Sequence, residues 1–514
     1  MIREFEFVSA GRILFGAGAF DRAASLILSL GSHPLVVTGR SALAAPGSSA
    51  AGDQDSARAS EDSIGKVGSA TGHGVVANLN GDAASTAAAR RSGGDSGSSR
   101  PHGVHPDGPL GRLETALAAE GVSTVRFLVR GEPTTDLVDR GVRMALAAGC
   151  DCVVGLGGGS VLDAAKAIAG LMTNGGESLD YLEVVGRGRI LENPAAPILA
   201  IPTTSGTGSE VTKNSVLAEP RAGVKASIRS PLLLPRIALV DPALTLSLPP
   251  LETAATGLDA LTQLIETYVT PRANPVTDLL ALDGIARAAR ALPRALRDGA
   301  DREARADMAL ASLFGGLCLA NAGLGAVHGI AAPLGGRHPV PHGVACALLL
   351  SHVFETNARV LRAAGTGSDG FPDAHHATGC STPGLPAERR LAGSAIGDGT
   401  QPDRATSPGG EALATRPGLT PLDRMELAAV TILEARRGAR LPGLRDAEDD
   451  PIAAAVAVLR ELVAGSRLPG LASYGVTQAD LPGLAAAALR ASSMKGNPAP
   501  LTAEDLTRII AAAL

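Results

Sequence analysis

The stretch Gly155-Leu-Gly-Gly-Gly-Ser160-Val-Leu-Asp163-Ala-Ala-Lys166 decides the fold class of this chain. It follows the apolar run 151–154, which predicts a buried strand, and it leads into residues 164–172, whose composition predicts a helix. Three consecutive glycines let the backbone approach a bound group, and the first turn of the helix offers unpaired N–H groups that favour phosphate. A turn that only packs a strand against a helix is the alternative, since the motif is neither G-x-G-x-x-G nor a Walker A loop.

Strands and helices alternate on both sides of this stretch. The pattern predicts strands at 34–38, 124–129, 197–201 and 237–240, and helices at 19–30, 110–117 and 137–148. Residues 2–7 also alternate, and we expect 12–15 to be their hairpin partner. Such alternation predicts a mostly parallel sheet with helices on both faces, as in a dinucleotide-binding domain.

After residue 248 the strand signals stop. Helical spacing predicts helices at 251–270, 277–292, 302–322, 451–464 and 502–511, and we expect Pro293 to end the second of them. We therefore predict an α/β domain over residues 1–248 and an all-α domain over residues 249–514. Two segments rich in Gly, Ser, Asp and Pro, about 44–109 and 363–419, lack large apolar residues and predict disordered, low-complexity insertions.

Composition limits the classes of partner. The 514 residues are 45% hydrophobic and 19% charged, with a net charge of -5, which predicts a globular protein and disfavours binding to nucleic acid or to an anionic membrane. The sequence contains no uncharged apolar run of about 18 or more residues, so we expect no membrane-spanning helix. The five cysteines lie mostly in apolar contexts and indicate core residues in a reducing compartment. Because the N-terminus shows no signal-peptide pattern, we expect a cytoplasmic protein.

Polar residues inside the apolar helical half are candidates for chemistry. Asp259 and Gln263 are four residues apart and share a helix face, and His328 and His342 follow in a second polar segment. One carboxylate and two imidazoles can bind Zn²⁺ or Fe²⁺ and leave a position open for a substrate oxygen. The alternative is structural: His328 caps a helix, and Asp259 is hydrogen-bonded near a helix N-terminus.

These motifs, in this order, resemble the iron-containing alcohol dehydrogenase family, which has the dehydroquinate-synthase-like fold. The matching stretches are 157–166, 202–212, Asp241-Pro242, 259–262, and His328 followed by 341–343. They span the chain apart from the two insertions. The resemblance implies an N-terminal dinucleotide domain, a C-terminal helical domain, and an active site in a cleft between them.

Site residues follow from the resemblance position by position. It assigns the cofactor pyrophosphate to Gly158, Gly159 and Ser160, and it includes Gly157 in the cofactor site. It places Asp163, Thr203, Thr204 and Lys225 along the cofactor, with Gly39 and Arg40 near the adenosine ribose. Asp259, His328 and His342 match three of the family's four metal ligands, and with Lys225 they form the expected catalytic set.

Three positions depart from the family pattern. Gln263 stands where the fourth ligand is usually histidine, and its carbonyl oxygen is a weaker ligand for Fe²⁺ or Zn²⁺ than imidazole. Ala332 stands where many members carry a further histidine. Gly39, followed by Arg40 and Ser41, replaces the acidic residue of members that prefer NAD. A cation in that place favours the 2′-phosphate of NADP over NAD. The alternative is that Arg40 is a solvated loop residue, which leaves both NAD and NADP open as the cofactor.

The expected function is an NAD(P)-dependent alcohol dehydrogenase or aldehyde or ketone reductase, with a divalent metal polarising the substrate oxygen. The partner is a small alcohol or aldehyde, and a homo-oligomer is possible. The nearest alternative is a metal-independent reductase of the maleylacetate type, in which Lys225, Arg229 or Arg337 holds substrate carboxylates. A catalytically silent nucleotide-binding protein and a lyase like dehydroquinate synthase are the more distant alternatives.

Overall fold

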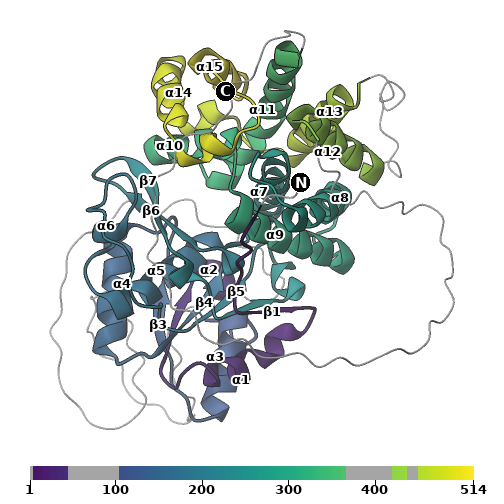
Figure 1. Cartoon of the computed structure of the whole chain (residues 1–514). Coiled ribbons are helices and arrows are strands. Elements are labelled where there is room, and N and C mark those ends of the chain that lie inside the picture. The colour runs from purple at the N-terminus through teal and green to yellow at the C-terminus, as the bar shows by residue number, and fades with distance from the viewer. Residues whose placement is uncertain (1–3, 44–103, 366–418, 437–449) are drawn as a thin grey trace, which may run out of the picture.

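The computed structural model describes residues 4–43, 104–365, 419–436 and 450–514. The two predicted insertions lie almost wholly outside these ranges, so the prediction that they are disordered stays a prediction. Figure 1 shows the strands gathered in one half of the protein with several helices beside them, whereas the other half consists of helices. In the described chain, every strand precedes residue 241, and the helices from α7 (Pro250–Val269) onward follow it.

Six parallel strands form the sheet, as the sequence predicts. Their order is β1-β8-β5-β4-β2-β3, and every neighbouring pair is parallel. The bounds are β1 Arg12–Phe15, β2 Pro34–Thr38, β3 Val125–Leu128, β4 Cys152–Gly157, β5 Ile198–Pro202 and β8 Ile237–Val240. Because the side chains of a strand alternate between faces, Leu35 and Val37 of β2 enter one core cluster and Val36 enters another.

Helices cover both of these faces. The cluster that contains Leu35 also contains residues of α4 (Thr135–Ala147) and α5 (Gly159–Asn174). The cluster that contains Val36 includes residues of α1 (Ala23–Leu28) and α3 (Pro109–Ala119). The sheet is therefore buried on two sides, which explains why its central strands are continuous apolar runs.

The prediction of an N-terminal hairpin is wrong. Residues 4–11 form no strand, and β1 pairs in parallel with β8 instead, with Arg12 opposite Ile237. The side chain of Asn321 hydrogen-bonds the backbone just after the expected first strand. The Val8 N–H donates to Asn321 Oδ1 at 2.6 Å, and Asn321 Nδ2 donates to the Val8 carbonyl at 2.8 Å. An asparagine of the helical half thus replaces the strand partner.

A second, two-stranded sheet was not predicted. β6 (Asn214–Glu219) and β7 (Val224–Arg229) form an antiparallel hairpin. Its turn lies against α10 (Ala326–Arg337), because a Cβ on Gly336 would be 2.9 Å from the Gly223 carbonyl. The hairpin therefore connects the sheet half to the helical half.

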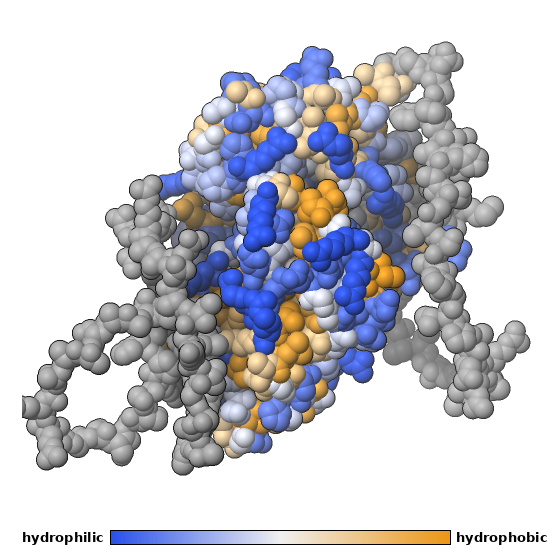
Figure 2. All heavy atoms as spheres, turned by 90° about the vertical axis from the view of Figure 1, so that its left-hand side faces the viewer, coloured by the Kyte–Doolittle hydropathy of each residue, from blue (hydrophilic) through white to orange (hydrophobic). Residues whose placement is uncertain are grey.

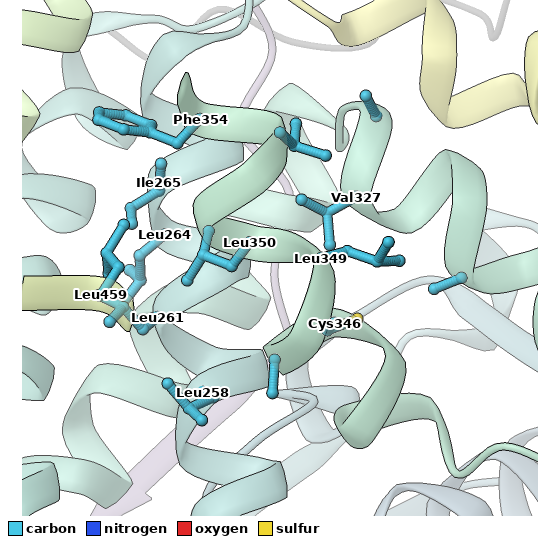
Figure 3. Packing of buried hydrophobic residues seen from close by; sticks show 14 of the residues in the cluster. Leu258, Leu261, Leu264, Ile265, Val327, Cys346, Leu349, Leu350, Phe354 and Leu459 are labelled. Carbon is cyan, nitrogen blue, oxygen red and sulfur yellow. The ribbon is translucent and has the colours of Figure 1, made fainter. Parts of the chain in front are cut away.

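The helical half contains one large core cluster. Figure 3 shows Leu258, Leu261 and Leu264 of α7 near Leu349 and Leu350 of α11. Its helices are α7 Pro250–Val269, α8 Pro275–Arg297, α9 Arg302–Ala322, α10, α11 His342–Gly365, α12 Pro421–Arg436, α13 Pro451–Ser466, α14 Leu481–Leu489 and α15 Ala503–Ala512. The remaining short helices are α2 Arg40–Leu43 and α6 Ser178–Tyr181.

Pro293 does not end its helix, contrary to the prediction. It lies inside α8, which continues to Arg297. Proline removes one backbone hydrogen bond from a helix interior. Leu292 and Ala295 on either side of it are buried in the core cluster, and this packing offsets the lost bond.

One helix is apolar enough to raise the question of a membrane. α11 has a mean hydropathy of 1.2 over an 18-residue window, and 67% of that window is buried inside the protein. α9 and α10 together also pass by composition, but they bend by 96°. The face in Figure 2 mixes hydrophilic and hydrophobic residues and has no continuous apolar band. The burial of α11 is typical of a core helix.

Candidate functional site

Three helices bring four donor groups to one point. α7 supplies Asp259, α10 supplies His328, and the first two turns of α11 supply His342 and Cys346. Their ligand atoms all lie within 4.8 Å of one another. Asp259 Oδ1 is 3.4 Å from His328 Nε2 and 3.9 Å from His342 Nε2. Cys346 Sγ is 3.8 Å and 3.7 Å from the same two nitrogens.

Close backbone contacts hold these helices in place. A Cβ on Gly343 would lie 2.6 Å from the Ala255 carbonyl, so the start of α11 packs directly on α7, one turn before Asp259. On α10, a Cβ on Gly329 would lie 3.1 Å from the terminal methyl of Met494. Small residues beside His328 and His342 thus allow the approach that places both rings.

Glu266 fixes the orientation of His328. Its Oε2 lies 2.7 Å from His328 Nδ1, and its Oε1 accepts the Val327 N–H at 2.6 Å. A carboxylate can only accept, so the proton of a neutral His328 is on Nδ1 and the Nε2 lone pair faces the cluster. This is the carboxylate–histidine support that metal-binding histidines commonly have.

The electrostatics of the cluster favour a cation. The negative charge of Cys346, opposed by burial, raises the pKa of His342 to about 9. Burial alone would lower the pKa of His328, but the charges of Cys346 and Glu266 outweigh it and hold that pKa well above its ordinary value. Burial raises the pKa of Asp259, and the imidazoles of His328 and His342 more than reverse this. The anionic groups around them, Asp259, Glu266 and Cys346, therefore stabilise positive charge at the two imidazole rings, either as a proton or as a metal in its place.

The donor set fits a divalent metal ion. Asp259 Oδ1 is buried and accepts no hydrogen bond within the described residues. Donors held at 2.0–2.3 Å from a tetrahedral ion are about 3.3–3.7 Å apart, and the distances from His328 and His342 differ from this by only a few tenths of an ångström. A carboxylate, two imidazoles and a thiol form a ligand set that suits a transition metal.

The structure places Gln263 beside Asp259. Its Nε2 donates to Asp259 Oδ2 at 3.3 Å, while its Oε1 lies 3.2 Å from where a Cβ on Gly315 of α9 would be. The amide nitrogen must face the carboxylate, because two oxygens would repel each other. Gln263 thus holds Asp259, and its expected role as a ligand stays a prediction.

Sequence reasoning missed Cys346 and Glu266. Cys346 lies four residues after His342, and Glu266 lies seven after Asp259, so each shares a helix face with a predicted ligand. This spacing could have identified both residues as candidates.

The two glycine-rich loops meet at the carboxyl ends of β4 and β5. A Cβ on Gly157 would lie 2.6 Å from Val161, and one on Gly159 would lie 2.7 Å from Thr207. The Thr203 N–H donates to the Gly157 carbonyl at 3.0 Å. The structure thereby brings together the predicted cofactor residues Gly157, Gly158, Gly159, Ser160, Thr203 and Thr204. Since α5 begins at Gly159, its N-terminal N–H groups face this corner, where phosphate binds well.

Asp163 holds the second loop to the hairpin. Its carboxylate accepts the Ser209 hydroxyl and, at 3.0 Å, the Val216 N–H. It also lies 3.0 Å from the buried amine of Lys166, which donates to the Ser209 carbonyl at 3.1 Å. These contacts define a structural role, and direct contact of Asp163 with a cofactor stays a prediction.

The remaining predicted cofactor residues lie at two other places. Gly39 is buried directly after β2, and Arg40 is exposed at the start of α2. Lys225 lies on β7, where its Nζ is 3.1 Å from Glu132 Oε1 and 3.0 Å from where a Cβ on Gly335 of α10 would be. Lys225 therefore lies between the sheet half and the helix that carries His328.

The loop that follows β5, residues 203–208, is predicted from the sequence to bind the cofactor and is called the cofactor loop; it touches two helices of the helical half, α7 and α9. A Cβ on Gly206 would lie 2.8 Å from Thr256 of α7, which is three residues before Asp259. A Cβ on Gly208 would lie 2.4 Å from the Cα of Gly316 on α9. The glycine-rich corner and the donor cluster are thus held at a fixed relative position.

Comparisons with known proteins agree with this architecture. A family model described as iron-containing alcohol dehydrogenase matches residues 102–242, and the model of the C-terminal part of that family matches residues 253–369. Together they cover half of the chain. The chain is 43% identical over 250 residues to alcohol dehydrogenase 4 of Schizosaccharomyces pombe, covering 48% of this chain and 58% of that one.

Two further similarities extend this result. Alcohol dehydrogenase 4 of Saccharomyces cerevisiae strain YJM789 is 40% identical over 262 residues, covering 51% of this chain and 68% of that one. The matches to the two yeast proteins thus span 58% to 68% of their length. A crystal structure of 1,3-propanediol oxidoreductase aligns over 100% of both chains with a TM-score of 0.68 and 26% identity.

Proposed function

We propose that this chain, which belongs to the iron-containing alcohol dehydrogenase family, interconverts an alcohol and its aldehyde or ketone with NAD or NADP. The observation that carries the proposal is the cluster of Asp259, His328 and His342. Its helix α7 is in direct contact with the glycine-rich loop at the end of β5. A site for a substrate oxygen is therefore held beside a site for a dinucleotide.

The sheet half contributes the cofactor site. Ser160 and the N–H groups at the start of α5 bind the pyrophosphate, and Thr203 and Thr204 line the neighbouring strand end. Lys225, between β7 and α10, orients the cofactor toward the helical half. The organisation is a cofactor domain over residues 1–248 and a metal and substrate domain over residues 249–514.

The helical half contributes the substrate-oxygen site. Asp259, His328 and His342 would hold a divalent ion, Fe²⁺ or Zn²⁺, with Glu266 keeping the His328 ring in place. When bound, such an ion acts as a Lewis acid that lowers the pKa of an alcohol. The surrounding helices bury Asp259 and His328 and leave 37% of the His342 side chain exposed, and the hydride would pass between the substrate carbon and the nicotinamide at this site.

Primary alcohols are the proposed substrate class. Relatives carry the names alcohol dehydrogenase and 1,3-propanediol oxidoreductase, and 1,3-propanediol has terminal hydroxyl groups. The four cysteines in the described residues are free thiols, which supports the proposed cytoplasmic location. The metal-independent alternative is less favoured, because Asp259, His328 and His342 converge as a donor set that fits a divalent ion, and Arg229 already forms an ion pair with Glu183.

The test is a screen of alcohols and aldehydes with NAD(H) and NADP(H), with and without a chelator. His328→Ala should abolish metal-dependent turnover and leave cofactor binding intact. His352→Ala, on α11, is the matched control and should remain active. If the wild type is fully active without metal and His328→Ala is equally active, the metal-free reductase function replaces the proposal.

A further inference from the structure

We propose that Cys346, as a thiolate, is the fourth protein ligand of the metal, and that Gln263 is a supporting residue that orients Asp259. This inference rests on the proposed function only for the presence of a metal. It concerns how this particular chain completes a site whose usual fourth ligand, a histidine, is absent.

The position of the sulfur carries the inference. Cys346 Sγ lies 3.8 Å from His328 Nε2 and 3.7 Å from His342 Nε2, and it is within 4.8 Å of the Asp259 donor atom. Two N-ligands at 2.05 Å and one S-ligand at 2.3 Å of a tetrahedral ion require N···S separations of about 3.6 Å. The thiol is therefore placed as a ligand, one helical turn beyond His342.

The rest of the core does not need a sulfur at this point. Cys346 is buried in α11 among aliphatic side chains, and Figure 3 shows it together with Leu349 and Leu350 on that helix. A small apolar residue at this position would contribute only packing. A thiol differs from such a residue in its affinity for soft and borderline metals.

The amide nitrogen of Gln263 binds another residue of the cluster and does not face a metal position. Its Nε2 donates to Asp259 Oδ2, which leaves Asp259 Oδ1 as the oxygen that faces the imidazoles. Its carbonyl oxygen lies beside Gly315 on α9 and, like Asp259 Oδ1, accepts no hydrogen bond within the described residues. A residue that fixes a ligating carboxylate in this way is a typical outer partner of a metal site.

Charge and softness then predict the metal. Asp259 and a Cys346 thiolate together neutralise a divalent ion in a buried site, which avoids a large desolvation cost. Thiolate and imidazole donors in tetrahedral array favour Zn²⁺ over Fe²⁺. The chain is therefore expected to retain zinc where its relatives' family name refers to iron.

Cobalt provides a direct test, because a thiolate ligand gives Co²⁺ an intense near-ultraviolet charge-transfer band. The Co²⁺-loaded full-length protein should show this band, and Cys346→Ser should lose it. Zinc affinity, measured by chelator competition, should fall at least about 100-fold in Cys346→Ser, more than an outer partner commonly costs. Cys318→Ser, at another buried thiol of the helical half, is the matched control and should keep both properties.

Gln263→Ala separates the two roles. It should keep the charge-transfer band and weaken zinc binding by about 10-fold to 100-fold. A band that persists in Cys346→Ser, or a wild-type protein that binds Co²⁺ without the band, overturns the inference. A wild type that binds no metal overturns the inference and the Lewis-acid step together, whereas a thiolate-bound cobalt in a protein without dehydrogenase activity overturns only the proposed function.

Discussion

Glu266 Oε2 lies 2.7 Å from His328 Nδ1, and both residues are buried between α7 and α10. The same carboxylate accepts the Val327 N–H through its other oxygen. One side chain thus fixes both the imidazole and the first turn of the helix that carries it. If the proposed metal binds, Glu266 would act on it through His328 and not as a ligand.

Glu266→Gln should therefore weaken metal binding without removing a ligand. An amide in this place no longer supplies the negative charge that favours a proton on Nδ1 of His328. The tautomer in which the Nε2 lone pair faces the donor cluster is then less strongly favoured. We expect metal affinity to fall about 10-fold to 100-fold, measured by chelator competition. Glu252→Gln, at an exposed position on the same helix, should have no effect, and equal affinities for both variants would contradict the role of Glu266.

The sheet half was largely predictable from the sequence, because buried parallel strands are short apolar runs. β4 and α5 follow from the run before Gly155 and the glycines after it. The hairpin β6–β7 was not found, since its strands mix Ser, Ala and Lys with few apolar residues. Its stability depends on packing against α5 and α10, which local sequence does not reveal.

The metal site was predictable only in part. Asp259, His328 and His342 are conspicuous because polar residues are uncommon in apolar helices. Cys346 is not, since a cysteine in an apolar helix has the appearance of a core residue. Its sulfur faces the imidazoles only because α7, α10 and α11 converge, and that convergence is a property of the tertiary fold.

Gly208→Ala should loosen the contact between the cofactor loop and α9. Gly208 has a φ of 59°, and a Cβ there would lie 2.4 Å from the Cα of Gly316. Gly149→Ala is the matched control, because Gly149 has a φ of 66° but no atom within 4 Å of the added Cβ. The control should cost about 1–2 kcal/mol of unfolding free energy, and Gly208→Ala about 1–3 kcal/mol more. Equal losses in chemical denaturation would show that the contact is not tight.

Arg40→Ala should change the choice between cofactors. Arg40 is exposed directly after β2, the strand beside β4. If its guanidinium binds the 2′-phosphate, losing a charge-assisted bond worth about 1.5–3 kcal/mol raises the KM for NADPH by at least about 10-fold. The KM for NADH should stay the same, and exposed Arg22→Ala should alter neither value. Equal changes for both cofactors would refute this role.

Glu210→Gln should change how stability depends on pH. Glu210 is buried just after the cofactor loop, and burial, partly opposed by a backbone hydrogen bond and by Lys166, raises its pKa from 4.5 to about 7. The folded protein therefore holds a proton that the unfolded chain releases between pH 4.5 and 7. Because the native state binds more protons in this window, the free energy of unfolding falls as pH rises through it and is flat above pH 7 with respect to this group.

The glutamine variant cannot titrate, so its stability relative to wild type should rise across this window. The total rise is on the order of 3 kcal/mol, since each pKa unit corresponds to about 1.4 kcal/mol. Urea denaturation of both proteins between pH 4 and 8 measures this difference, and exposed Glu192→Gln controls for the loss of one carboxylate. A difference between Glu210→Gln and wild type that stays constant from pH 4.5 to 7 would mean that Glu210 is already ionised in the folded protein.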